Sequence, residues 1–197
     1  MRVAPGAWRL ALPLLLLALP ALVVPTAALA LAFAGYAILA FYRDPERSPP
    51  PTGVVAPADG RVSVVREEGD RTRVGVFMNV TDVHVNRAPL DGAVERVDHH
   101  PGGHLPAFSK ESERNERVVI ACDRYELTLI AGTVARRITP YVAPGDRVAR
   151  GDRIGHIAFG SRVDVLLPPG VDADDLRVGT GDRVRAGETV IAPPPGG

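Results

Sequence analysis

The sequence is poor in lysine and cysteine, with one of each among 197 residues, Lys110 and Cys122. A single cysteine excludes an intrachain disulfide, and within the apolar run 117–122 we expect a small buried side chain. Lys110 lies in a charged, polar stretch, which argues against pyridoxal phosphate because that cofactor needs a lysine anchor. The formal net charge is zero, so nucleic-acid binding has no electrostatic support.

Glycine and proline are abundant, at 20 and 19 residues, and favour short strands and turns over long helices. From residue 54 to residue 192, β-branched runs are separated by Gly and Asp turns, which is a strand pattern. An internal repeat relates GDRVARGDRI (145–154) to GDRVRAGETV (181–190). Such strand–turn–strand units are common in barrel-sandwich folds and carry no chemistry by themselves. We therefore predict a mainly β fold, a compact antiparallel domain resembling a barrel sandwich.

The N-terminal part is uncharged from Leu10 to Tyr42. As one helix these 33 residues would reach about 50 Å, against about 30 Å for the hydrocarbon core of a bilayer. Pro20 and Pro25 mark a break, so we predict a helical hairpin that dips into the membrane and returns. Arginines at both ends favour a hairpin with both ends in the cytoplasm. A secretory signal peptide with its site near ALA (28–30) is the alternative, although the apolar run continues well past it.

The chain therefore divides into three parts. Residues 1–42 form the membrane-associating segment, residues 43–53 a proline-rich charged linker, and residues 54–197 the β domain. We expect the chain to lie at the cytoplasmic face of the cell membrane. The sequence leaves self-association into homo-oligomers open.

Three short stretches hold candidate chemistry. Asp59 lies in the turn of APADGRV (56–62), where an aspartate beside glycine commonly forms an Asx turn. His84 ends a valine-rich strand in MNVTDVHVNRAP (78–89), and an isolated histidine is usually structural. Ser161 follows Gly160 at the head of SRVDVL, a strand of period two that directs the serine hydroxyl to the apolar side. Taken alone, Gly-Ser most often marks a turn.

A metal site is not expected. The histidine cluster HHPGGH (99–104) is interrupted by Pro and two Gly, which prevents presentation of two ligands from one helix face. No cysteine or paired acid accompanies it. A metal-dependent hydrolase therefore fails for lack of ligands.

The motifs PADG, DVHVNRAP, ARRI and FGSRVD follow one another after a hydrophobic N-terminus and FYRDPERSPP. In that order they resemble phosphatidylserine decarboxylase in its short bacterial and archaeal form, from about Phe41 to Leu167. The resemblance implies a proenzyme that cuts itself between Gly160 and Ser161 into a large chain (1–160) and a small chain (161–197). It also implies that Ser161 becomes a pyruvoyl group, the only cofactor, and that residues 54–197 are the catalytic domain.

The resemblance assigns roles to three side chains. Asp59 would orient His84, which would activate the Ser161 hydroxyl, the logic of a catalytic triad. Longer members carry two histidines in an HxxH pattern, whereas here Arg87 stands at the second position. His84 must then serve both self-cleavage and decarboxylation, or yield one task to another group such as His100.

The mature reaction is likewise implied by the family. The ketone would form a Schiff base with the amine of phosphatidylserine and accept the electrons released with CO₂, which leaves phosphatidylethanolamine. Arg136 and Arg137 are candidates for the lipid phosphate, with a solvated strand edge as the alternative. The competing class is a membrane-tethered barrel-sandwich adaptor or carrier without catalysis. The repeat turns lack the lysine of a carrier, and no sustained heptads indicate an adaptor coiled coil.

Overall fold

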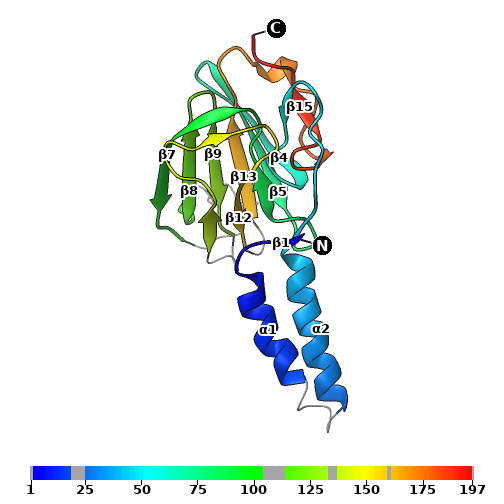
Figure 1. Cartoon of the computed structure of the whole chain (residues 1–197). Coiled ribbons are helices and arrows are strands. Elements are labelled where there is room, and N and C mark those ends of the chain that lie inside the picture. Colours follow the sequence, from blue (N-terminus) through cyan, green and yellow to red (C-terminus); the bar gives the residue numbers. More distant parts are fainter. Residues whose placement is uncertain (1, 19–24, 104–113, 133–136, 159–160, 197) are drawn as a thin grey trace. The chain divides into compact units, whose positions relative to one another are not determined.

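A computed structural model describes residues 2–18, 25–103, 114–132, 137–158 and 161–196 (Figure 1). The chain separates into two compact units, Met1–Pro45 and Glu46–Gly197. Gly160 and Arg136, as well as His104 and Lys110, lie outside the described residues.

The first unit is a helical hairpin, α1 (Ala7–Ala18) and α2 (Pro25–Phe41), with a short ladder of β1 (Arg2–Val3) and β2 (Arg43–Asp44). The helices pack closely at Gly35, where a Cβ atom would lie 2.6 Å from Leu15 Cδ2. Large apolar side chains remain exposed on both helices: Trp8, Leu10, Leu12, Leu16, Leu17, Leu29, Phe33 and Tyr36. Among the described residues, neither helix is long and apolar enough to span a bilayer.

The second unit is almost entirely β structure, so the prediction of a mainly β fold is confirmed. Its elements are β3 (Val54–Val55), β4 (Gly60–Glu68), β5 (Arg71–Met78), β6 (Val85–Arg87), β7 (Gly92–His100), β8 (Arg117–Cys122), β9 (Glu126–Ile130), β10 (Ile138–Pro140), β11 (Arg147–Val148), β12 (Arg153–Ile157), β13 (Ser161–Leu166), η3 (Ala173–Asp175), β14 (Arg183–Val184) and β15 (Val190–Ala192).

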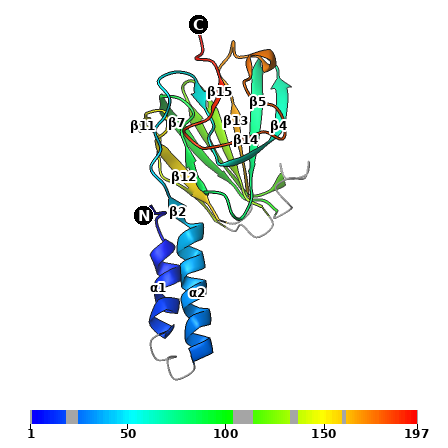
Figure 2. The same ribbon diagram turned by 90° about the vertical axis from the view of Figure 1, so that its right-hand side faces the viewer.

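One large antiparallel sheet dominates this unit, in the order β11-β7-β8-β9-β13-β5-β4-β14. Figure 1 shows β7, β8, β9, β13 and β5 in this order across the view, and Figure 2 shows β14 beside β4. Two smaller sheets, β10-β12-β6 and β15-β3, complete the unit. The core collects the alternating apolar residues of these strands, including Val74, Leu127, Leu129, Val163 and Val165. Cys122 is buried as expected, and burial raises the pKa of its thiol.

The internal repeat is also a structural repeat. Gly145 donates its N–H to Val94 O at 2.8 Å, and Gly181 donates to Val62 O at 2.8 Å. Both glycines have positive φ angles, 96° and 99°, a conformation that favours glycine. Each repeat therefore adds one two-residue strand to an edge of the large sheet, β11 to β7 and β14 to β4.

Gly60 fixes the start of β4, and its replacement is the sharpest test of this packing. A Cβ atom there would lie 2.0 Å from Phe77 O, with φ at 143°. We predict that Gly60→Ala lowers the free energy of unfolding by about 3 kcal/mol or more, because backbone must move. The control Gly69→Ala has φ at 64° and no neighbour within 4 Å, so it should cost about 1 kcal/mol. Urea unfolding measures both; equal losses would contradict the close approach.

Candidate active site

Ser161 is the first residue of β13, a central strand paired with β5 on one side and β9 on the other. It lies opposite Met78 of β5 and is 0% exposed. As its parity predicts, it shares the core face with Val163 and Val165. Among the described residues its Oγ has no hydrogen-bond partner. A buried hydroxyl without a partner is costly, which marks this position as a candidate functional site.

His84 follows a tight turn and precedes β6. The turn is closed by the N–H of Asp82, which donates to Asn79 O at 2.9 Å, and by the N–H of Asn79, which donates to Asp82 Oδ2 at 2.9 Å. The buried His84 ring places Nδ1 3.0 Å from the backbone oxygen of Asp82. Because a carbonyl can only accept, Nδ1 carries the proton in this contact. In the neutral tautomer that makes this contact, Nε2 is the nitrogen that can accept a proton.

Backbone contacts bring the sequence motifs together. The N–H of Ile157, four residues before Ser161, donates to His84 O at 3.3 Å. The N–H of Arg87 donates to Pro57 O at 2.9 Å, which joins DVHVNRAP to PADG. Gly60 packs against Phe77 and Met78, and Met78 is the partner of Ser161. The segments that carry Asp59, His84 and Ser161 therefore meet at one end of the large sheet.

Asp59 has partners that the sequence did not indicate. Arg47 Nη2 donates to both carboxylate oxygens, at 3.1 and 2.9 Å, and the N–H of Ala186 donates to Oδ1 at 2.8 Å. Arg47 Nη1 also donates to Glu188 at 3.1 Å. The Arg47 side chain is 7% exposed, so this ion pair is largely removed from solvent. Arg47 stands in FYRDPERSPP, a segment interpreted from the sequence as a linker.

Arg87 occupies the position of the second histidine in HxxH, and its side chain packs inside the β domain. Its side chain is buried, and Nη1 donates to Gly151 O at 2.8 Å. A Cβ atom at Gly187 would lie 2.9 Å from Arg87 Cδ and 3.7 Å from Arg47 Cβ. The two turns of the repeat thus enclose this arginine next to Arg47.

Arg137 and His100 differ in their distance from the site. The N–H of Ala158 donates to Arg137 O at 3.2 Å, so the exposed Arg137 lies across from the segment just before Ser161. His100 is on β7, separated from β13 by β8 and β9. Three strand spacings amount to about 14 Å, beyond the reach of direct proton transfer to Ser161. The described residues hold no group of three or more potential metal ligands.

The sequence did not indicate His156 as a candidate site residue. It pairs with Val85 across β12 and β6, and its Nδ1 lies 2.9 Å from the Tyr141 hydroxyl oxygen. Burial lowers the pKa of His156, so the ring is neutral near pH 7. A single histidine inside the strand RIGHI is typical of ordinary packing. Only its contact with the Tyr141 hydroxyl shows that it belongs to a polar pair.

The outer face of β13, opposite Ser161, is also polar and partly closed. Arg162 donates to both oxygens of Asp164 at 2.7 and 2.9 Å, and both side chains are 5% exposed. Gly75 leaves room for this pair, since a Cβ atom there would lie 2.6 Å from Asp164 Oδ1. Burial raises the pKa of Asp164, and the Arg162 charge opposes that effect.

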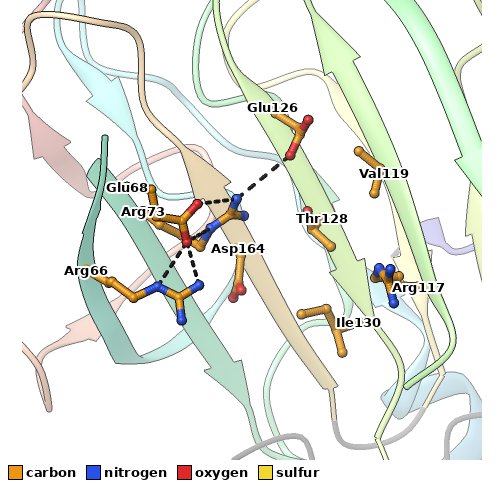
Figure 3. A pocket seen from close by; sticks show the side chains of 9 residues that line it. All are labelled: Arg66, Glu68, Arg73, Arg117, Val119, Glu126, Thr128, Ile130 and Asp164. Atoms are coloured by element: carbon orange, nitrogen blue, oxygen red, sulfur yellow. Dashed lines mark hydrogen bonds and ion pairs between the residues drawn. The ribbon is translucent and has the colours of Figure 1, made fainter. Parts of the chain in front are cut away.

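Beside this pair is a pocket of about 330 Å³. Figure 3 shows Glu68 between Arg66 and Arg73 in it, and hydrogen bonds from Arg73 hold the pKa of Glu68 at about 2. The pocket is lined by Arg66, Glu68, Arg73, Arg117, Val119, Glu126, Thr128, Ile130 and Asp164. It lies on the face of the sheet opposite the Ser161 hydroxyl, so it belongs to a different surface from the candidate active site.

Comparison with known proteins gives one consistent result. The family model described as phosphatidylserine decarboxylase matches residues 36–192. A putative archaetidylserine decarboxylase proenzyme of Halobacterium salinarum is 56% identical over 191 residues, covering 95% of this chain and 97% of that protein. A phosphatidylserine decarboxylase proenzyme of Streptomyces avermitilis is 53% identical over 176 residues, covering 87% and 78%.

A third relative, from Thermobifida fusca and also named phosphatidylserine decarboxylase proenzyme, is 52% identical over 174 residues, covering 86% and 76%. The noncatalytic adaptor is therefore set aside in favour of a decarboxylase. With a matching family model over most of its length and relatives above half identity, the chain belongs to the phosphatidylserine decarboxylase family.

Proposed function

We propose that this chain cuts itself between Gly160 and Ser161 and then decarboxylates phosphatidylserine to phosphatidylethanolamine and CO₂. One observation carries the proposal: the Ser161 hydroxyl is buried at the head of a central strand and has no hydrogen-bond partner among the described residues. The proenzyme names of the relatives support processing of the chain. A buried serine held for ordinary packing normally pairs its hydroxyl with a protein group.

The cleavage step balances without an external reagent other than water. Ser161 Oγ attacks the Gly160 carbonyl carbon, the Gly160–Ser161 C–N bond breaks, and an ester forms. Elimination of the Ser161 α-proton releases the Gly160 carboxylate and leaves dehydroalanine. Addition of one water and loss of one ammonia give a pyruvoyl group at residue 161. The two products together therefore equal the precursor plus water minus ammonia.

His84 is the proposed base for this step. A serine hydroxyl is a weak nucleophile near neutral pH and needs a neighbouring group to accept its proton. The Asp82 carbonyl holds Nδ1, which leaves Nε2 as the basic nitrogen. Asp59, fixed by Arg47 and the Ala186 amide, is proposed to set the electrostatics around His84. In the mature enzyme His84 is proposed to return a proton to the substrate carbon.

The residues around Ser161 fit a pyruvoyl group. Such a group accepts the electron pair released with CO₂ from the substrate amine. Ser161 is 0% exposed and shares a face with the core residues Val163 and Val165, so a group at this position is shielded from bulk solvent. The polar pair Arg162–Asp164 on the opposite face anchors the strand that would begin with this group.

The substrate is proposed to be taken from a membrane, at its cytoplasmic face. The hairpin of α1 and α2 exposes eight large apolar side chains, which suits insertion into a bilayer without crossing it. Arg137 is exposed near the segment before Ser161 and is proposed to contact the lipid phosphate, together with Arg136.

Archaetidylserine is a second candidate substrate. The relative named for that activity is 56% identical and matched over 97% of its length. Both lipids present a serine head group to the same chemistry, so Ser161, His84 and Asp59 would act alike on either. Parallel assays of CO₂ release from the two lipids distinguish the candidates.

Replacement of the nucleophile tests the proposed function. Ser161→Ala should remain a single uncut chain and release no CO₂ from phosphatidylserine vesicles, because the hydroxyl and the ketone are both lost. Ser63→Ala is the matched control, since Ser63 is also a strand serine and donates to Gly75 O at 3.4 Å. It should be cut and active. A denaturing gel and a CO₂ assay provide the measurements; a cut or active Ser161→Ala chain would refute the proposal.

The role of Asp59 is tested by comparing its replacement with that of Glu188, the other carboxylate that Arg47 binds. Asp59→Asn should slow self-cleavage by about 100-fold or more, the scale of removing a charged partner of a catalytic histidine. Glu188→Gln also removes a carboxylate from Arg47, yet should change the rate less than about twofold. The rate of appearance of the short fragment is followed on gels. Equal slowing by both variants would mean that Asp59 acts only through the Arg47 ion pair.

A further inference from the structure

A row of arginines crosses the outer face of the large sheet at the end that carries Ser161. The register joins Arg183 to Arg61, Arg61 to Phe77, and Phe77 to Arg162. It continues from Arg162 through Ile130 and Arg117 to His100. Paired residues of adjacent strands share a face, so four arginines and a histidine lie in one row, one residue along β13 from Ser161. We call Arg183, Arg61, Arg162 and Arg117 the arginine row.

The outer part of this row is available to a partner. Arg61 is exposed while its Nη1 donates to Gly181 O at 2.8 Å, and the Arg183 side chain is 71% exposed while it forms an ion pair with Asp82 at 3.3 Å. Arg162 is instead buried against Asp164, so its charge is already compensated. Arg137, also exposed, adds positive charge near the segment before Ser161.

Val80 stands at the same end. Among the described residues of the second unit it is the one large apolar side chain that is mostly exposed, at 60%. It lies two residues beyond Met78, in the turn that Asn79 and Asp82 close. Arg183 Nη2 contacts Asp82 Oδ1 at 3.3 Å, which ties this turn to the arginine row. An apolar tip thus projects beside exposed cations on a turn held by three polar contacts.

The opposite end of the sheet carries a different set of charged side chains. Exposed acids occupy the β4–β5 turn, at Asp70, and the β8–β9 turn, at Asp123. Further exposed aspartates lie in and before η3, which follows β13 beyond its far end: Asp172, Asp174 and Asp175. Figure 1 shows η3 in orange at the top of the domain. Exposed arginines accompany these acids, Arg124 in the β8–β9 turn and Arg177 after η3, so the far end carries charges of both signs, whereas the exposed residues beside Ser161 include Arg61, Arg183 and Arg137.

We propose that this end docks on an anionic bilayer surface, with Val80 entering the head-group region and Arg61 and Arg183 facing lipid phosphates. The inference rests on the proposed function, because that reaction requires the end with Ser161 to meet a lipid. Exposed arginines beside an apolar tip complement a surface of phosphates above acyl chains.

A tryptophan reporter tests the docking directly. Trp8 is the only tryptophan, so full-length Trp8→Phe/Val80→Trp carries one reporter at the turn. Its emission should shift to the blue on vesicles of phosphatidylcholine with phosphatidylglycerol. Trp8→Phe/Arg124→Trp is the matched control, with its reporter in the β8–β9 turn at the far end, and should not shift. An unshifted reporter at 80, an equal shift at 124, or no binding to the vesicles would overturn the proposal.

Charge removal gives a second measurement. Arg61→Ser/Arg183→Ser should weaken vesicle binding about 25-fold, at about fivefold per arginine near an anionic surface, whereas Arg124→Ser should change it less than about twofold. Wild-type affinity from the double variant would overturn the proposal. Self-cleavage and CO₂ release from detergent-dispersed phosphatidylserine are followed in parallel. If the wild-type chain is cut and active but the double variant binds vesicles with wild-type affinity, only the docking inference falls; an uncut, inactive wild-type chain defeats the proposed function instead.

Discussion

The pairing of β13 on both sides is the constraint on which the rest of the structure depends. Because β5 and β9 fix its register, Ser161 must lie opposite Met78 with its hydroxyl toward the core. The same alternation sends Arg162 and Asp164 to the outer face, where they form a buried ion pair. Breaking one partner of such a pair is strongly destabilising, so the strand that begins with Ser161 is anchored from both faces.

The remaining site residues are positioned by what packs against that strand. Gly60 lets β4 approach β5 at Phe77, and this approach sets the turn that holds Asp59. The β12 segment reaches His84 through the Ile157 amide, just before the chain enters β13. Arg47 then joins Asp59 to Glu188 in the second repeat. Segments more than a hundred residues apart in sequence thereby meet at one end of the large sheet.

Period-two alternation and turn residues made the β fold and the inward Ser161 predictable from the sequence, and the repeat was visible as two matching decapeptides. The partners of Asp59 were not predictable, because Arg47 lies in a proline-rich segment whose pairing depends on long-range packing. The contact between His84 and the backbone oxygen of Asp82 was not predictable either, because every residue has a backbone oxygen whatever its side chain. His100 looked suitable by residue type, yet strand order, which composition does not encode, places it three strands from β13.

The central claim is that Ser161 is converted from a side-chain nucleophile into a ketone at a new chain end. Intact-mass analysis of the purified wild-type protein tests it most directly. The account predicts a fragment of residues 161–197 that is lighter than the serine-ended peptide by one ammonia and lacks a free α-amine. A fragment that begins with an unmodified serine, or a folded chain that stays whole, would contradict it.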